Sequence, residues 1–254
     1  MTRPTLRRHL WLCALALAPW AARADPAPGG TVRPLQWVAG DLPPFAWRSS
    51  AGPRGYAQEL VQLMGQRLGR DVDVGYFPWA RAVQLTERSD NTGVFPLART
   101  PDREARFQWL VPLMTVRYVF LTAAGERRLG LAELRTRRVG VLRGSPIVAN
   151  LRAERFTTII EGKDYKDLLR LLAERGLDAV YAGGPMLDAA LAEYGYPAEQ
   201  FTPQQSLGEA RLYIAASPGL APAEAQRWLQ AYEKLVEDGS VERLRRRYFP
   251  TERH

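Results

Sequence analysis

Short apolar runs alternate with amphipathic stretches along most of the chain. In residues 55–68 the apolar residues Leu60, Met64 and Leu68 share one face at helical spacing, which predicts a helix. Expected strands are Leu35–Ala39, Val72–Phe77, Val94–Leu97, Arg117–Thr122, Arg138–Leu142, Thr157–Ile160, Leu177–Tyr181 and Leu212–Ser217. Expected helices are Gly55–Leu68, Trp79–Arg88, Ile147–Arg155, Tyr165–Glu174, Met186–Tyr194, Pro222–Asp238 and Val241–Tyr248. Strands that alternate with helices in this way predict an α/β fold with mostly parallel sheets.

The alternation of strands and helices occurs in two blocks, one before and one after about residue 125. Ala123–Arg128 is the expected crossing point between them. The sequence holds no internal repeat, and Pro26–Gly30 is its one segment of low complexity. About 230 residues therefore suffice for two small α/β units rather than one large one.

Residues 1–24 have the pattern of a secretory signal peptide. Three arginines precede the apolar run Leu10–Leu17, and Ala22–Ala24 offers the small-x-small sequence that signal peptidase recognises. The alternative is an uncleaved membrane anchor, but a bilayer-spanning helix needs about 20 apolar residues. We expect cleavage after Ala24, export to the periplasm, and a mature chain that begins with a short tail at residues 25–30.

Histidine and cysteine are absent from the body of the chain. The two histidines are His9 and His254, and the single cysteine is Cys13, within the signal. This excludes a Ser-His-Asp triad, a Cys-His pair and ordinary zinc sites, and no disulfide supports the fold. A carboxylate pair of the glycosidase type remains open, but no motif suggests one. We expect no enzymatic activity, no cofactor and no metal.

The charge of the chain does not indicate a nucleic-acid partner. The formal charge of +8 includes four arginines of the signal, and without them 31 basic and 27 acidic residues give +4. Nucleic-acid binding would need a basic face, whereas the one dense run is Arg243–Arg247. Cations suit the C-terminus of a helix, so we interpret this run as a solvated helix end.

Six motifs follow one another in order. They are Asp41–Phe45 (DLPPF) with Gly55-Tyr56, Pro78–Ala82 (PWARA), Thr100–Arg103 (TPDR) with Phe107 and Pro112, Val139–Ser145 (VGVLRGS), Gly176–Ala179 (GLDA), and Gly239-Ser240 through Phe249. In this order, behind a signal peptide, they resemble the bacterial extracellular solute-binding proteins of family 3, the polar-amino-acid-type periplasmic proteins of ABC transporters. The resemblance implies the type II periplasmic-binding-protein fold, in which two α/β lobes joined by a two-stranded hinge hold the ligand between them. Lobe 1 would comprise residues 31–122 plus 213–249, and lobe 2 residues 123–212.

Arg103 is the leading candidate for ligand binding. In the family the arginine of T-x-x-R holds the carboxylate of the ligand, and a guanidinium matches a carboxylate with two charge-assisted hydrogen bonds. The resemblance includes Thr100 in the same segment. We expect Arg103 to face a water-filled cleft when the lobes are open; the alternative is a surface arginine beside Asp102 or Glu104.

Further candidates lie on both expected lobes. Gly144 and Ser145 stand between a strand and a helix, where backbone N–H groups favour an anion, although a plain turn is the alternative. A possible second anion contact is Arg81, unless it is a solvated helix residue. The remaining candidates are the aromatic residues Phe45, Tyr56 and Trp79, for which core packing is the alternative, and Asp41 of the first motif.

The motifs depart from the family at the positions that hold an α-amino acid. Small hydroxyl residues are expected just before the threonine, but Pro96 and Ala98 stand there. An acid that holds the α-ammonium is expected after the G-x-x-D-A strand, but the aligned position is Gly183. We therefore predict a small anion-bearing ligand that need not be a free amino acid: a modified amino acid, a peptide-like compound or an organic acid.

The leading functional hypothesis is a soluble, monomeric binding protein that delivers a small ligand to an ABC permease at the inner membrane. The alternative is an extracytoplasmic sensor that acts through a partner protein. A sensor fused to its output domain would carry a transmembrane segment and a cytoplasmic domain, and we expect neither. The same fold occurs as a non-catalytic half of some cell-wall lytic enzymes, which would need a second domain.

Overall fold

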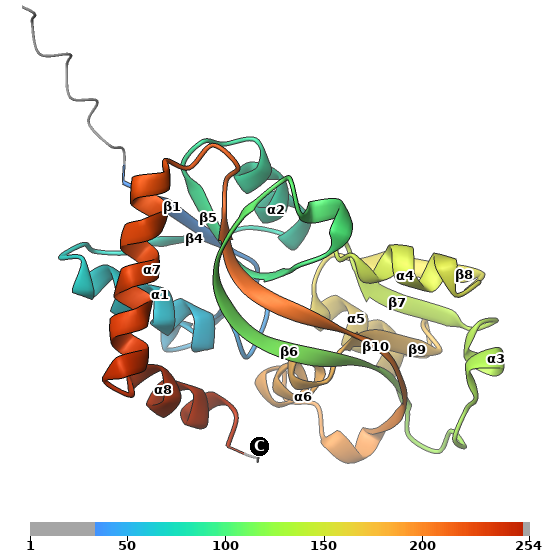
Figure 1. The fold of residues 1–254 in the computed structure, drawn as a ribbon. Helices are drawn as coiled ribbons and strands as arrows, with labels where there is room; N and C mark the ends of the chain where they lie inside the picture. The colour runs from blue at the N-terminus through green and yellow to red at the C-terminus, as the bar shows by residue number, and fades with distance from the viewer. Residues whose placement is uncertain (1–33, 251–254) are drawn as a thin grey trace, which may run out of the picture. The chain divides into compact units, whose positions relative to one another are not determined.

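The computed structural model describes residues 34–250, so the predicted signal peptide and tail lie outside the described residues. Eight strands form one sheet in the order β4-β1-β5-β10-β6-β9-β7-β8 (Figure 1). They are β1 (Gln36–Ala39), β4 (Val74–Tyr76), β5 (Thr92–Ala98), β6 (Gln108–Ala123), β7 (Arg138–Leu142), β8 (Thr158–Gly162), β9 (Ala179–Gly183) and β10 (Phe201–Ala216). The predicted α/β fold is confirmed.

The sheet has two parallel ends and an antiparallel middle. Strand β1 is parallel to β4 and β5, and β7 is parallel to β8 and β9, whereas β6 and β10 run antiparallel to their neighbours. We call β4-β1-β5 with its helices the first half, and β9-β7-β8 with its helices the second half. The helices of the first half are α1 (Tyr56–Arg67), α2 (Trp79–Glu87), α7 (Pro222–Glu237) and α8 (Ser240–Tyr248). Those of the second half are α3 (Leu131–Leu134), α4 (Ile147–Ala153), α5 (Tyr165–Ala173) and α6 (Gly184–Glu193).

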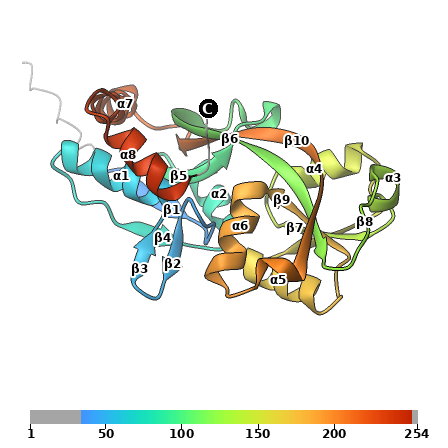
Figure 2. The same cartoon turned by 90° about the horizontal axis from the view of Figure 1, so that it is seen from below.

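Strands β6 and β10 connect the two halves. Each has 16 residues, and they pair from Gln108 and Ala216 at one end to Ala123 and Phe201 at the other. Both are much longer than the predicted strands, because exposed polar positions alternate with buried ones where one face meets solvent. Figure 2 shows the same two strands running from the first half of the sheet into the second.

A hairpin of β2 (Trp47–Ser49) and β3 (Gly52–Arg54) follows β1 and was not predicted. Its strands are three residues long, and Gly52 has φ of 111°, which a residue with a side chain rarely adopts. The guanidinium of Arg54 lies 5.1 Å from the ring centre of Trp47, across the hairpin. Strands this short leave no period-two pattern in the sequence.

The long helix α7 is fixed to the first half by Glu224. This carboxylate is 1% exposed and accepts hydrogen bonds from Trp228 Nε1 at 2.9 Å and from the guanidinium of Arg70. Burial raises the pKa of the Glu224 carboxyl, but the hydrogen bonds from Arg70 and Trp228 outweigh it, and the net pKa lies below its usual value. The ionised form of Glu224 therefore stabilises the fold.

A Glu224→Gln variant is expected to lower the free energy of unfolding by about 1–2 kcal/mol at pH 7, because Arg70 loses its charged partner. A lowered native pKa gives stability above the unfolded value of about 4.3, and that stability is lost as the pH falls through the native pKa. Denaturant unfolding at pH 7 and pH 3 should show the difference from wild type shrinking with acid. Glu242→Gln, at an exposed partner of Arg246, is the control. Equal stability of Glu224→Gln and wild type at pH 7 would contradict this role.

Candidate functional site

Two adjoining cavities lie between the first and second halves. The Arg103 cavity has a volume of about 30 Å³, and the Asp164 cavity, which also contains Asp41 and Lys163, about 160 Å³. Leu42, Trp79 and Leu142 line both, so the cavities are neighbouring parts of one cleft. Since a water needs about 10–15 Å³ by this measure, the Arg103 cavity has room for a carboxylate-sized group but not for a whole amino acid.

Arg103 stands at the end of a 3-10 turn (Pro101–Arg103) and is 5% exposed. Its guanidinium donates to the carbonyl of Ala98 at 3.3 Å and, across the cleft, to the carbonyl of Gly144 at 2.9 Å. No carboxylate within residues 34–250 forms an ion pair with it. In this structure the second half covers the side chain, so the expectation that Arg103 faces water in the open form stays a prediction.

The electrostatics of Arg103 favour an anion. Burial lowers the pKa of its guanidinium below the usual value, although the nearby charge of Asp102 opposes the shift. A buried cation held only by carbonyl oxygens retains most of its desolvation cost, which an anionic partner would offset. Thr100 stands at the start of the same turn, and its hydroxyl is buried without a hydrogen-bond partner among the described residues.

Gly144 is a contact between the halves. Its φ is +79°, and a Cβ added there would lie 2.8 Å from both Cα and Cβ of Ala80 in α2. Its carbonyl accepts the bond from Arg103, and Ser145 donates its backbone N–H to Leu142 at 3.1 Å. In this structure the turn itself uses the Ser145 N–H, which the prediction had assigned to an anion. Ser145 does line the Arg103 cavity.

The other predicted residues divide between cleft, core and surface. Trp79 lines both cavities, and Asp41 lines the Asp164 cavity, where Arg48 pairs with it at 2.7 Å. Neither Phe45 nor Tyr56 lines them: their rings lie 6.4 Å apart in a buried aromatic cluster that also contains Phe249. Phe45 and Tyr56 were predicted to face the ligand, but both rings pack in the core beside the end of α8 and do not reach the cleft.

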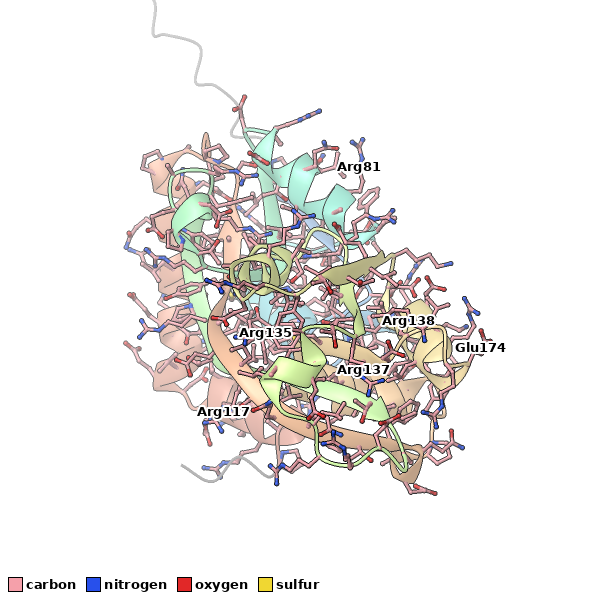
Figure 3. All side chains as sticks on the ribbon, turned by 90° about the vertical axis from the view of Figure 1, so that its right-hand side faces the viewer. Arg81, Arg117, Arg135, Arg137, Arg138 and Glu174 are labelled. Atoms are coloured by element: carbon pink, nitrogen blue, oxygen red, sulfur yellow. The ribbon has the colours of Figure 1, made fainter. Side chains whose placement is uncertain are left out.

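Arg81 does not line the two cavities either. Its side chain is exposed and hydrogen-bonds to Gln84 one turn along α2 at 3.3 Å, and Figure 3 shows it at the surface. The same figure shows Arg135, Arg137, Arg138 and Glu174 on the surface of the second half. Arg135 and Arg138 there pair with acids, Glu154 and Asp178 respectively. In this structure Arg81 is thus a solvated residue on the surface of α2 and does not reach the cleft as an anion contact would.

Two tyrosines of the Arg103 cavity were missed by sequence reasoning. Tyr118 comes from β6 and Tyr165 from the first position of α5, and each looks like an ordinary core residue of its element. Burial raises the pKa of Tyr118 to about 12, although the charge of Arg103 opposes the shift. Both phenols are therefore neutral at physiological pH and can donate or accept hydrogen bonds.

The positions that depart from the family pattern lie at this same cavity. Pro96 and Ala98 line it, as does Met186. Gly183 lies at the start of α6, and a Cβ added to it would be 2.5 Å from Met186 Sδ. The thioether of Met186 thus fills the space where a side chain at position 183 would begin. No group of three or more potential metal ligands occurs within residues 34–250.

The sequence matches the family model of the bacterial extracellular solute-binding proteins, family 3, over residues 37–251. The chain belongs to this family. The match covers both halves and the cleft between them, and it confirms the resemblance carried by the six motifs. No helix within residues 34–250 has the length and apolar character needed to cross a membrane. No curated protein matches this family 3 chain.

Solved structures share the fold of this family 3 protein. A histidine kinase sensor domain with similarity to periplasmic binding proteins has 23% identity and a TM-score of 0.75, over 85% of this chain and 96% of its own. An ancestral arginine-binding protein bound to arginine has 17% identity and a TM-score of 0.76, over 86% and 99%. An ABC uptake transporter substrate-binding protein from Streptococcus pneumoniae with bound histidine has 12% identity and a TM-score of 0.76, over 85% and 92%. The type II fold is thereby confirmed.

Proposed function

We propose that this protein is a periplasmic solute-binding protein that holds a small carboxylate-bearing ligand in the cleft and delivers it to an ABC transporter. The observation that carries the proposal is Arg103: a buried guanidinium in a cavity between the two halves, with no acidic partner within residues 34–250. Family membership supports the class of function. Binding without chemical change fits the described residues, which include neither histidine nor cysteine.

The cleft suggests how such a ligand would bind. Its carboxylate would meet the guanidinium of Arg103, with the ring of Trp79 beside it. Because the Arg103 cavity holds only a few atoms, the rest of the ligand would extend past Leu42 and Leu142 into the Asp164 cavity. Polar groups there come from both halves: the Asp41–Arg48 pair, and Lys163 with Asp164 at the start of α5.

The two halves correspond in this proposal to two lobes, residues 31–122 with 213–249 and residues 123–212. Strands β6 and β10 would act as the hinge, because they are the two segments shared by both halves of the sheet. Contacts across the cleft, Arg103 with Gly144 and Ala80 against Gly144, would form when the lobes close. A monomer with one ligand site suffices for this mechanism.

A thermal-shift screen of amino acids, organic acids and short peptides is expected to identify ligands, since binding to the native state raises the melting temperature. The hits should share a carboxylate, and amines or sugars without an acidic group should give no shift. A screen whose only hits lack an anionic group would contradict the proposal.

We also expect the two lobes to close around the ligand. Small-angle scattering with a verified ligand at saturation should show a smaller radius of gyration than scattering without it, because the lobes come together. The same measurement with an amine that gives no thermal shift is the control. An unchanged radius at saturation would contradict hinge closure.

A sensory role through a separate partner is the second candidate. The specific observation in its favour is the fold shared with a histidine kinase sensor domain. Co-purification of the liganded protein with a permease would support transport, whereas co-purification with a membrane-bound kinase would support sensing.

A further inference from the structure

We infer that the ligand carries a small neutral hydrogen-bonding group, a hydroxyl or an oxo group, on the carbon next to its carboxylate, as 2-hydroxy and 2-oxo acids do. The inference rests on the proposed function and names the class of substrate. It excludes free α-amino acids as the preferred ligands. It follows from the charge, the polar groups and the size of the Arg103 cavity.

The charge of the cavity opposes an α-ammonium. Among the described residues 34–250, Arg103 is the one charged residue that lines it, and no aspartate or glutamate of that range does so. An α-ammonium is one carbon away from the carboxylate, so it would be buried beside a cation without an acid to pair with. The acids of the cleft, Asp41 and Asp164, line the other cavity. They are therefore placed to contact the far end of a ligand rather than its α-carbon.

The polar groups of the cavity suit a neutral substituent. Tyr118 is 5% exposed and Tyr165 is 4% exposed, and neither hydroxyl forms a hydrogen bond within residues 34–250. A ligand hydroxyl or carbonyl could therefore supply a hydrogen-bond partner that these phenols lack among the described residues. Since a phenol can donate and accept, the pair can bind either group. Tyr118 also lies close enough to Arg103 for each to perturb the pKa of the other.

The shape of the cavity removes the usual position for an acid. Met186 Sδ occupies the space beside Gly183, where an acidic side chain would otherwise begin. Pro96 and Ala98 add apolar surface on the opposite half. A volume of about 30 Å³ does not accommodate an acylated amine beside the carboxylate.

The test compares acids that share a carbon skeleton and differ only at the α-carbon. The first set is 2-hydroxy-4-methylpentanoate, 2-oxo-4-methylpentanoate, leucine and 4-methylpentanoate, and the second is the corresponding set with the skeleton of phenylalanine. Calorimetry on the mature protein is expected to give at least tenfold tighter binding of the hydroxy or oxo acid than of the amino acid. The hydroxy acid and the oxo acid should each also bind more tightly than the unsubstituted acid.

The result of this comparison distinguishes failure of the inference from failure of the proposed function. If leucine or phenylalanine binds as tightly as its hydroxy counterpart, the inference is wrong and the proposed function stands. If neither these acids nor any carboxylate of the thermal-shift screen binds the folded protein, the proposed function fails and the inference with it.

Variants test the role of the two phenols. Tyr118→Phe and Tyr165→Phe should weaken binding of the hydroxy acid about tenfold and leave binding of the unsubstituted acid nearly unchanged, because only the former loses a partner. Tyr181→Phe is the matched control: it is equally buried, but its hydroxyl donates to the carbonyl of Leu207 and it does not line the cavity. Unchanged discrimination in both cavity variants would overturn the assignment to these tyrosines.

Discussion

An Arg103→Ala variant is expected to lose roughly thirty-fold or more in affinity for a carboxylate identified by the thermal-shift screen. Removing one partner of a buried charge-assisted contact commonly costs about 2–5 kcal/mol, and about 1.4 kcal/mol corresponds to tenfold. In this structure the effect has two sources. The ligand loses its cation, and the closed cleft loses the bond from Arg103 to the carbonyl of Gly144.

Stability without ligand should change much less. The variant loses hydrogen bonds to Ala98 and Gly144 but also removes a buried cation that no described acid neutralises, so the two effects offset each other to within about 1 kcal/mol. Arg81→Ala is the control, since that arginine is exposed and contacts only Gln84 by hydrogen bond. Calorimetry that gives Arg103→Ala the wild-type affinity would show that the ligand does not use this residue.

A Gly144→Ala variant is expected to weaken ligand binding by roughly tenfold to a hundredfold. The added methyl would overlap Ala80 in α2, at 2.8 Å from its Cα and Cβ, and backbone cannot move aside as a flexible side chain can. Overpacking of this kind costs about 1–3 kcal/mol. In the proposed mechanism that cost falls on the closed form alone, so it appears as lost affinity and as a larger radius of gyration with ligand.

Alanine at Gly144 also strains the backbone, because φ there is +79°. Gly125→Ala is the matched control: Gly125 has φ of +84°, and a Cβ added to it meets no atom within 4 Å. Both variants should lose a similar free energy of unfolding, about 1 kcal/mol. Only Gly144→Ala should lose affinity. Equal affinities of the two variants would mean that the approach of Ala80 to Gly144 does not form part of the bound state.

The outer strands and the helices could be predicted because the spacing of apolar residues along the sequence indicates each of them. Residues 138–142 form a strand with the predicted bounds, since VGVL is buried on both faces and a turn follows at Gly144. The prediction covered 6 of the 16 residues of β6 and 5 of the 16 residues of β10, because only their apolar parts were visible in the sequence. Pro112 and Pro203 in these strands, both unfavourable inside a sheet, concealed the remainder.

The site could be predicted only in part, for a different physical reason. Arg103 could be proposed from its motif, whereas Tyr118 comes from the connecting strand β6 and Tyr165 from α5 of the second half, and both line the cavity only when β6 and α5 pack together. Nothing in the sequence around Tyr165 distinguishes a cavity phenol from a core aromatic. Conversely, Phe45 and Tyr56 match a ligand-facing motif yet pack against Phe249, about 200 residues further along the chain.

The position of β10 in the sheet constrains the order in which the strands can pair during folding. It lies between β5 and β6, although it is the last strand to be synthesised. Leu212 pairs with Ala98, a contact that spans more than a hundred residues of chain. Until it forms, β5 and β6 both present unpaired backbone edges, which other chains can join. Assembly of the first half is therefore a late and slow event, and a chain that ends before β10 would be prone to aggregate rather than form half of the protein.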